Sequence, residues 1–282
     1  MEKTSNKMKR NQRIAYISQY FVTHPNQLIS LSVFSNYFDA AKSSISEDID
    51  FVREIFEEHE IGTIESITGV QGGMIFKPFT SELACQSLMD ELQERLKEGK
   101  RILPGNYVYL ADLLQDPVLL DRISRMIAAH YQDKKIDAVV TIETKGIGLA
   151  VNVAYYLNVP HVVARRSSSD MDGSTISVNY VSGSHQRVSK MEISKASIKP
   201  DSRVLIIDDF LRNGGTMIGL MSLIEEVNCK TVGICVLVES TQKDHQPLPN
   251  YESLLKVEIV YDKESSRFIL ESELGSFFAE KN

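Results

Sequence analysis

Residues 204–216 constrain the fold of this chain more than any other segment. The segment runs from four apolar residues (204–207) through two acids (Asp208, Asp209) and a short loop to Gly214, Gly215 and Thr216, before an apolar helical pattern at 217–227. Unpaired backbone N–H groups and the helix dipole converge at such a strand–turn–helix junction and favour an anion. The two acids can accept hydrogen bonds from neighbouring hydroxyl groups. The segment therefore predicts a binding site for a sugar phosphate.

The order of these features resembles the 5-phosphoribosyl-1-pyrophosphate (PRPP) motif of type I phosphoribosyltransferases. The resemblance implies that Asp208 and Asp209 hold the two ribose hydroxyls and that residues 212–216 surround the 5′-phosphate. An ordinary strand–helix turn with acids at its polar end is the alternative, but the acids, glycines and threonine coincide in the required context. The predicted PRPP site contains Asp208, Asp209, Phe210, Leu211, Arg212, Asn213, Gly214, Gly215 and Thr216.

Length and composition predict an ordinary soluble protein of two domains, residues 1–78 and 79–282. The chain has 282 residues, of which 43% are hydrophobic and 24% charged. The first residues are polar, no apolar run reaches membrane-spanning length, and three scattered cysteines lack metal-ligand spacing. We therefore expect a cytoplasmic protein with reduced cysteines, no membrane association and no metal site. The net charge of −7 argues against indiscriminate nucleic-acid binding.

The first eighty residues predict a winged helix-turn-helix. Apolar spacing indicates helices at residues 13–21 and 32–38, and a longer helix that begins around residue 42. Two short strands at 61–68 and 74–77 follow, joined by a glycine-rich turn. Three helices and a hairpin in this order are typical of the winged helix-turn-helix.

The start of the third helix has the chemistry of a DNA-reading surface. Short hydroxyl donors and one cation occupy its first turn, where recognition helices contact bases and phosphates. Basic residues before and at the start of the first helix can bind the phosphate backbone beside the third helix. The alternative is a small helical subdomain whose serines only cap the helix. The predicted DNA-binding residues are Lys9, Arg10, Arg13, Lys42, Ser43, Ser44 and Ser46.

After residue 78 the pattern predicts an α/β domain. An amphipathic helix at 81–98 is expected to turn Leu83, Leu88, Leu92 and Leu96 inward. Strand and helix patterns then alternate, with strands expected at 137–142 and His161–Ala164 and helices after residue 117 and at Ile147–Leu157. This alternation predicts a doubly wound parallel sheet that binds ligands beyond the carboxyl ends of its strands.

Two further segments are candidates for contact with a pyrophosphate group. Thr144, Lys145 and Gly146 stand directly before a helix at a strand end, where a plain helix cap is the alternative. The resemblance to phosphoribosyltransferases implies that this is the pyrophosphate loop. It also implies that the polar segment 180–187, expected to be a loop, closes over PRPP. Tyr180, Ser184 and Arg187 of this segment are candidates for contact with pyrophosphate or DNA, and an exposed hairpin tip is the alternative. The strand-end arginines Arg165 and Arg166 are additional candidates for pyrophosphate, with ordinary surface arginines as the alternative.

Taken whole, the chain resembles the PurR family of purine regulators from Gram-positive bacteria. The resemblance rests on the segment Ala-Ala-Lys-Ser-Ser-Ile-Ser-Glu-Asp at 40–48, joined to a phosphoribosyltransferase-like domain. It implies a homodimeric transcription factor that binds a double-stranded DNA operator. It also implies that the second domain is catalytically idle and senses PRPP, bound with Mg²⁺. The alternative is an active purine phosphoribosyltransferase with an accessory N-terminal domain, although no residue set can be assigned to a purine pocket.

Overall fold

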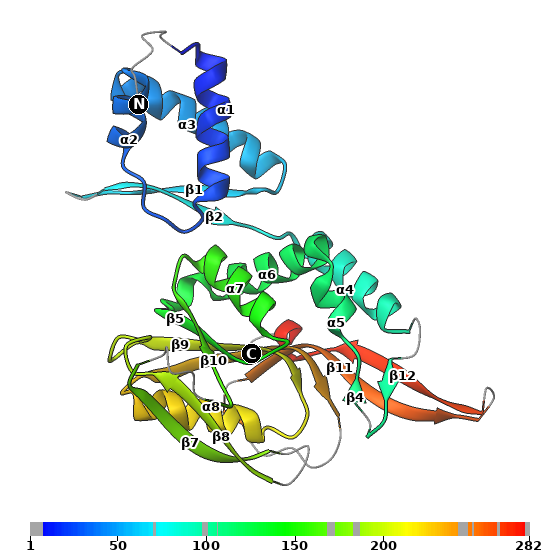
Figure 1. The fold of residues 1–282 in the computed structure, drawn as a ribbon. Helices are drawn as coiled ribbons and strands as arrows, with labels where there is room; N and C mark the ends of the chain where they lie inside the picture. The colour runs from blue at the N-terminus through cyan, green and yellow to red at the C-terminus, as the bar shows by residue number, and fades with distance from the viewer. Residues whose placement is uncertain are drawn as a thin grey trace.

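The computed structural model describes residues 8–69, 72–97, 101–105, 107–167, 173–182, 187–241, 248–249, 251–263 and 266–279. These residues form a small N-terminal domain and a larger α/β domain, as Figure 1 shows. A single strand-to-helix connection after Pro78 links the two.

The N-terminal domain has the predicted order of three helices followed by a hairpin. Its elements are α1 (Arg10–Thr23), α2 (Leu31–Phe38), α3 (Lys42–Glu58), β1 (Gly62–Ile67) and β2 (Gly73–Pro78). The strands β1 and β2 pair antiparallel. The Ser30 hydroxyl caps α2 by accepting from the Ser32 amide, and Asp39 ends it in the left-handed conformation. Apolar residues of all three helices and both strands form one buried core, so the winged helix-turn-helix prediction is confirmed.

The larger domain is built on a six-stranded sheet in the order β12-β11-β10-β9-β5-β6. Its elements are α4 (Glu82–Lys97), β3 (Ile102–Leu103), β4 (Tyr107–Val108), α5 (Ala111–Gln115), α6 (Pro117–Tyr131), η1 (Gln132–Lys134), β5 (Ala138–Ile142), α7 (Ile147–Leu157), β6 (His161–Ala164), β7 (Thr175–Ser182), β8 (Arg187–Ser194), β9 (Arg203–Leu211), α8 (Gly215–Glu226), β10 (Lys230–Ser240), β11 (Tyr251–Asp262), β12 (Arg267–Leu274) and η2 (Ser276–Phe278). All strand pairs of this sheet are parallel except β11–β12, which is antiparallel.

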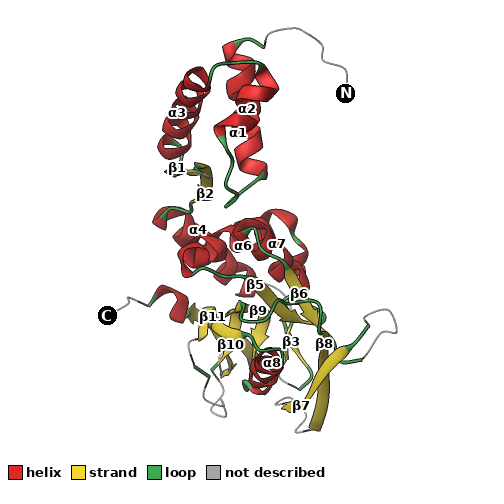
Figure 2. Cartoon of the chain, turned by 90° about the vertical axis from the view of Figure 1, so that its left-hand side faces the viewer, coloured by secondary structure: helices red, strands yellow, loops and turns green. Residues whose placement is uncertain are grey.

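Different elements cover the two faces of the sheet. Helices α4 to α7 pack on the face that lies toward the N-terminal domain, and α8 and the β7–β8 hairpin pack on the other (Figures 1 and 2). Each face has its own core of buried apolar residues, and strands β5, β9 and β10 contribute to both. The predicted doubly wound α/β fold is thus confirmed, and strand β5 and most residues of β9 and β10 are buried, as is typical of parallel strands covered on both faces.

One predicted core residue of α4 is wrong. Leu83 is 78% exposed, whereas Leu88, Met89, Leu92 and Leu96 are buried. Five residues separate Leu83 from Leu88, and at about 100° per residue this places Leu83 about 140° away around the helix. The buried stripe therefore passes it by.

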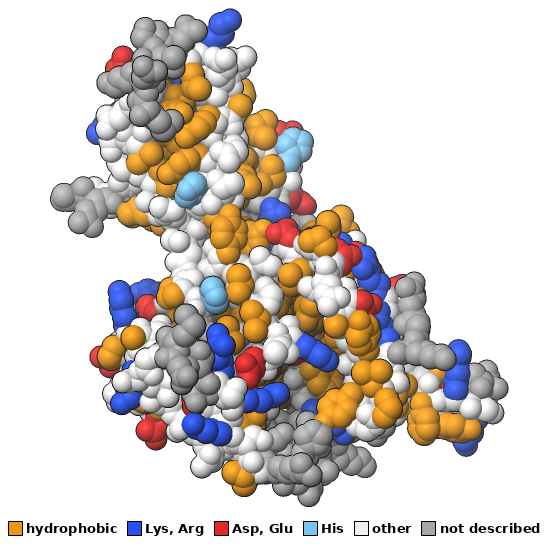
Figure 3. Space-filling model, in the orientation of Figure 1, with side chains coloured by type: hydrophobic (Ala, Val, Ile, Leu, Met, Phe, Trp, Pro, Cys, Tyr) orange, Lys and Arg blue, Asp and Glu red, His pale blue; other side chains and the backbone are white. Residues whose placement is uncertain are grey.

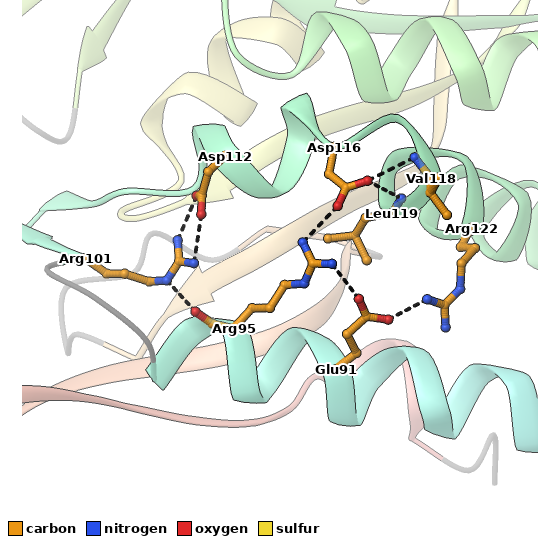
Figure 4. A network of polar contacts seen from close by, with 8 residues as sticks. All are labelled: Glu91, Arg95, Arg101, Asp112, Asp116, Val118, Leu119 and Arg122. Atoms are coloured by element: carbon orange, nitrogen blue, oxygen red, sulfur yellow. Dashed lines mark hydrogen bonds and ion pairs between the residues drawn. The ribbon is translucent and has the colours of Figure 1, made fainter.

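An ion-pair network fixes α4 to the helices that follow (Figure 4). Glu91 accepts from Arg95 at 2.7 Å and from Arg122 at 2.5 Å, and Arg95 also donates to Asp116 at 2.9 Å. Arg101 donates through both guanidinium nitrogens to Asp112, at 2.8 and 2.9 Å. The network holds α4, α5 and α6 in one arrangement above the sheet.

The three cysteines are free, as expected, and Cys229 and Cys235 are buried in the core of the α/β domain. Within the part of the chain that the structure describes, no helix combines the length and the apolar character that a membrane span needs.

Candidate functional site

The two acids of the PRPP motif lie within strand β9 and not after it, which corrects the predicted strand end. Strand β9 pairs with β10 as far as Leu211, opposite Glu239. On its other side, β5 pairs only as far as Val140, opposite Ile206. Asp208 and Asp209 therefore lie beyond the pairing with β5, so the backbone is extended there but open on one side.

Burial dominates the electrostatics of this acid pair. Asp208 is buried, and its Oδ1 accepts from the backbone amide of Asp209 at 3.0 Å. Burial raises the pKa of both carboxyls, that of Asp208 well above its usual value, while Arg166 opposes the shift at Asp208 and Lys145 opposes it at Asp209. Groups that donate hydrogen bonds to the carboxylates, such as ribose hydroxyls, would stabilise their charged form.

A helix N-terminus faces the same space. Gly214 caps α8 with a φ of 82°, in the left-handed region that favours glycine, and Gly215 is the first residue of the helix. The first amides of a helix lack partners within it, so they are free to bind an anion. The predicted Gly-Gly-Thr turn is therefore present in the conformation that an anion site requires.

The segment 143–146 brings a second helix N-terminus to the site. It leads from β5 into α7 and contains a cis peptide bond between Glu143 and Thr144. Gly146 packs directly against the acid pair, because a Cβ atom built on it would lie 2.4 Å from Asp208 Oδ1. Only glycine fits this position without displacing the carboxylate.

These elements enclose a cavity of about 440 Å³ at the carboxyl ends of the strands. Twelve of the thirteen predicted PRPP residues line it; Gly146 does not, but it contacts Asp208 behind the cavity wall. The lining residues are Tyr107, Ile142, Glu143, Thr144, Lys145, Arg166, Tyr180, Ser189, Asp208, Asp209, Phe210, Leu211, Arg212, Asn213, Gly214, Gly215, Thr216 and Met217. The structure thus brings together segments that are far apart in the sequence.

Of the segment expected to be a loop at 180–187, residues 180–182 and 187 are strand, and residues 183–186 lie outside the described residues. Tyr180 belongs to β7, is buried, and packs with its Cβ region against Gly219 of α8. Ser184 lies outside the described residues, as does the side chain of Arg187. Of the two candidate arginines, Arg166 lines the cavity, whereas Arg165 forms a backbone bridge with Glu192 and does not line it.

Five cavity residues were not predicted as part of the site: the apolar Ile142 and Met217, and the polar Tyr107, Glu143 and Ser189. Tyr107 comes from the short β3–β4 hairpin, and the guanidinium carbon of Arg212 lies 5.0 Å from its ring centroid. Ser189 comes from β8, and Glu143 accepts from the Arg166 amide at 2.7 Å. The position of Glu143 directly before the predicted Thr144 was a usable signal. Tyr107 and Ser189 carry no local signal, because only the tertiary fold brings them to the site.

The predicted DNA-binding residues gather at the start of α1 and of α3. Lys9, Lys42 and Ser43 are exposed, and Ser44 and Ser46 are partly exposed. The two arginines pair with an acid of the same domain: Arg10 donates to Asp48 at 3.0 Å and Arg13 donates to Asp48 at 2.8 Å. Asp48 is only 1% exposed, so this ion pair joins α1 to α3 inside the domain.

Among the described residues, no group of three or more His, Cys, Asp and Glu side chains is arranged to hold a metal ion. The acid pair supplies two carboxylates, which suit Mg²⁺ that already has phosphate ligands but not a metal held by the protein alone.

Comparison with known proteins gives the family of the chain. Residues 9–78 match the family described as bacterial purine repressor, N-terminal, and residues 110–266 match the phosphoribosyl transferase domain. A protein of Streptococcus pneumoniae named PurR is 45% identical over 275 residues, which are 97% of this chain and 99% of that protein. The chain belongs to the PurR family.

The PurR match covers both domains in another relative as well. The purine biosynthesis transcriptional repressor PurR of Bacillus subtilis is 41% identical over 271 residues, 96% of this chain and 94% of that protein. Among solved structures, an adenine phosphoribosyltransferase of Rhodothermus marinus is similar with a TM-score of 0.53 and 24% identity, covering 61% of this chain and 99% of that one. This last likeness supports the phosphoribosyltransferase fold of the second domain.

Proposed function

We propose that this protein is a cytoplasmic, DNA-binding regulator of purine biosynthesis genes whose binding to DNA responds to PRPP. One observation carries the proposal: in a chain whose full-length relatives are named as regulators, the cavity gathers twelve of the thirteen residues of the predicted PRPP site. The second domain serves as a sensor and not as an enzyme.

The proposed binding mode follows from the chemical groups that line the cavity. The carboxylates of Asp208 and Asp209 accept hydrogen bonds from the ribose hydroxyls, and the amides at the start of α8 donate hydrogen bonds to the 5′-phosphate. Lys145 and Arg166 line the cavity beside the acids and supply positive charge for the pyrophosphate. The 440 Å³ of the cavity lies within the usual range for small-molecule sites.

Mg²⁺ enters the proposal with the ligand. Mg²⁺ binds phosphate oxygens readily and typically takes only one or two carboxylates from a protein. Asp208 and Asp209 fit that role. The ion would offset part of the ligand's negative charge beside the acid pair.

The N-terminal domain is the proposed DNA-binding part. Lys9, Lys42 and Ser43 present donors to solvent, with Ser44 and Ser46 partly exposed beside them. Arg10 remains 55% exposed while it pairs with Asp48, so its guanidinium can also face a phosphate. In Arg13, which is 14% exposed, the pairing with Asp48 leaves less surface for DNA.

We also propose that the protein forms a homodimer, which would recognise an operator with repeated half-sites. Figure 3 shows apolar atoms gathered on the visible face of the N-terminal domain. Large apolar side chains of this domain that are exposed include Val22, Leu28, Val33, Tyr37, Phe51 and Ile55. Exposed apolar surface of this kind is typical of interfaces. Light scattering of the purified protein measures the mass directly, and a monomer at working concentration would contradict this part.

The central experiment is a titration of purine-gene promoter fragments with the protein, with and without PRPP and Mg²⁺, at a stated salt concentration. We expect the apparent affinity for DNA to change with PRPP, and calorimetry to detect PRPP binding without DNA. No heat with PRPP and Mg²⁺ would refute the sensor.

Catalysis is tested separately. The protein is incubated with PRPP, Mg²⁺ and hypoxanthine, guanine or xanthine, and pyrophosphate and nucleotide are measured. We expect no product above the background without protein. Robust nucleotide formation would show a working phosphoribosyltransferase instead.

A further inference from the structure

Helix α7 begins at the cavity and ends at the N-terminal domain. Its N-terminus follows the cavity-lining segment 143–145 and Gly146. In both Figure 1 and Figure 2, α6 and α7 lie between the sheet and the N-terminal domain. Three hydrogen bonds join the C-terminal end of α7 to the end of α1 and the turn after it: Tyr155 Oη to Thr23 O at 3.1 Å, Asn26 Nδ2 to Tyr156 O at 2.7 Å, and Asn158 Nδ2 to Asn26 O at 3.4 Å.

The length and packing of α7 favour rigid-body movement of the whole helix. It has 11 residues, which corresponds to a length of about 16 Å. Leu149, Ala150, Val153, Ala154 and Leu157 are buried along its inner side. Closely packed helices shift as rigid units more readily than they deform. A displacement at one end of α7 is therefore expected at the other.

Each end of α7 meets a group that another element also holds. At the cavity end, Gly146 leaves no free space against the Asp208 carboxylate. At the other end, Asn26 binds α7 through its side chain and carbonyl, while its own amide donates to Phe76 O of β2 at 2.8 Å. Asn26 thus ties α7 to both the turn after α1 and the hairpin of the winged helix.

We propose that α7 transmits the occupancy of the cavity to the winged-helix domain, with Asn26 as the joint between the two. The inference rests on the proposed function, since it names how PRPP would change DNA binding. A ligand that contacts both the acid pair and the segment 143–145, which leads into α7, favours one position of the helix over another. Only such a difference between two states can couple two sites, and the coupling is reciprocal.

The test removes the two hydrogen bonds of the joint that depend on side chains of Asn26 and Tyr155, and it leaves both binding sites intact. Asn26→Gly deletes the side-chain amide and keeps a residue suited to its φ of 53°, and Tyr155→Phe removes only the hydroxyl. In the double variant we expect the affinity for PRPP without DNA, and for DNA without PRPP, to stay near those of the wild type. The ratio of DNA affinities with and without PRPP, about 5- to 150-fold in typical coupled proteins, should fall toward one.

Two matched controls make the result specific. Tyr261→Phe removes a hydroxyl from an exposed tyrosine on β11, far along the chain from the joint. Asp133→Asn breaks the 3.0 Å pair between Lys77 and Asp133, which also joins the two domains but does not involve α7. Both controls should keep the wild-type ratio.

Each outcome is decisive. A double variant that keeps the full ratio overturns the role of α7, and so does an equal loss in Asp133→Asn. A wild type that binds PRPP and DNA without any effect of one on the other refutes the proposed function, and with it the joint. Failure of the proposed function is thus seen in the wild type, and failure of this inference in the variants.

Discussion

The cavity and the predicted DNA-binding face both carry clustered charge, but they differ in how that charge is balanced. In the cavity, burial raises the pKa of Asp208 and Asp209, so their charged forms are stabilised only weakly by the protein itself. In the N-terminal domain, the two arginines at the start of α1 meet a buried carboxylate, Asp48. Buried charged groups without a full counter-charge are typical of a ligand-binding site, whereas a buried ion pair inside a domain typically has a structural role.

The difference has an energetic consequence. Neutralising an acid of the cavity should remove ligand binding and leave the fold as stable as before, or more stable. Neutralising Asp48 should weaken the fold. The following substitutions test this contrast.

The largest expected effect is on PRPP binding in Asp208→Asn and Asp209→Asn. Each loses a charged acceptor for a ribose hydroxyl, and hydrogen bonds to charged groups contribute about 1.5–3 kcal/mol each, so the double variant should bind about 100-fold more weakly or worse. Calorimetry with PRPP and Mg²⁺ measures the loss. Operator binding without PRPP should remain.

The same variants should be more stable than the wild type at neutral pH. The pKa of each acid is higher in the folded than in the unfolded chain, so the folded state binds more protons and stability falls as the pH rises through that interval. Removing the charge should therefore raise the melting temperature at neutral pH, and the gain should shrink as the pH falls. Asp201→Asn, at an exposed position, is the control for both measurements. Unchanged PRPP affinity in the double variant would contradict the cavity assignment.

The second effect is the loss of stability in Asp48→Asn. Arg13 is only 14% exposed and would lose its counter-charge, and removing one partner of a buried pair costs about 3 kcal/mol or more. Asp50→Asn is the matched control on the same helix, because Asp50 is 52% exposed and exposed pairs contribute about 1 kcal/mol or less. Denaturant unfolding compares the two. Equal losses of stability in the two variants would contradict the structural role of the pair between Asp48 and the arginines. Tighter DNA binding with no loss of stability in Asp48→Asn would show that the arginines are held for DNA instead.

The contrast also explains what could be predicted from the sequence. The cavity motif is contiguous, and its glycines, acids and helix start have fixed geometric meanings, so nearly all of its residues could be named in advance. Alternating strand and helix patterns likewise gave the sheet and the winged helix. Local chemistry determined both.

What escaped prediction depends on contacts between distant segments. Tyr107 reaches Arg212 from a hairpin about a hundred residues earlier. The pairing of Arg10 and Arg13 with Asp48 requires α1 and α3 to cross at one point. No local sequence pattern predicts either of these contacts. Charge by itself marked Arg13 as a DNA contact, and only its burial reveals the internal partner.

A smaller effect is expected from Gly146→Ala, which tests how tightly the cavity wall is packed. The added Cβ would lie 2.4 Å from Asp208 Oδ1 and 2.8 Å from Thr141 Oγ1, so the carboxylate must move. Overpacking of this kind costs about 1–3 kcal/mol, and we expect weaker PRPP binding together with lower stability. Gly148→Ala is the control two residues later, where the nearest atom, Leu120 Cδ2, is 3.6 Å away. There the helix should gain up to about 1 kcal/mol, and PRPP binding should be unchanged. If the two variants have the same stability and the same affinity for PRPP, the residues around Gly146 can move to accommodate a Cβ atom.

The smallest effects are expected on the DNA face, in Lys42→Ala and Ser43→Ala. Both residues are exposed at the start of α3, so the fold should keep its stability and PRPP should bind as in the wild type. If Lys42 contacts a phosphate, its loss should reduce the slope of log affinity against log salt concentration by about 1. Ser43 is uncharged, so its loss should weaken binding by about 1 kcal/mol and leave the slope unchanged.

Promoter titrations at several salt concentrations separate these two contributions. Lys230→Ala, an exposed lysine on β10 of the other domain, should change neither the affinity nor the slope. If Lys42→Ala and Ser43→Ala both match the wild type, the start of α3 does not read DNA. The exposed Lys42 and Ser43 would then be ordinary solvated side chains. The cavity would differ from this face as a binding site differs from an ordinary protein surface.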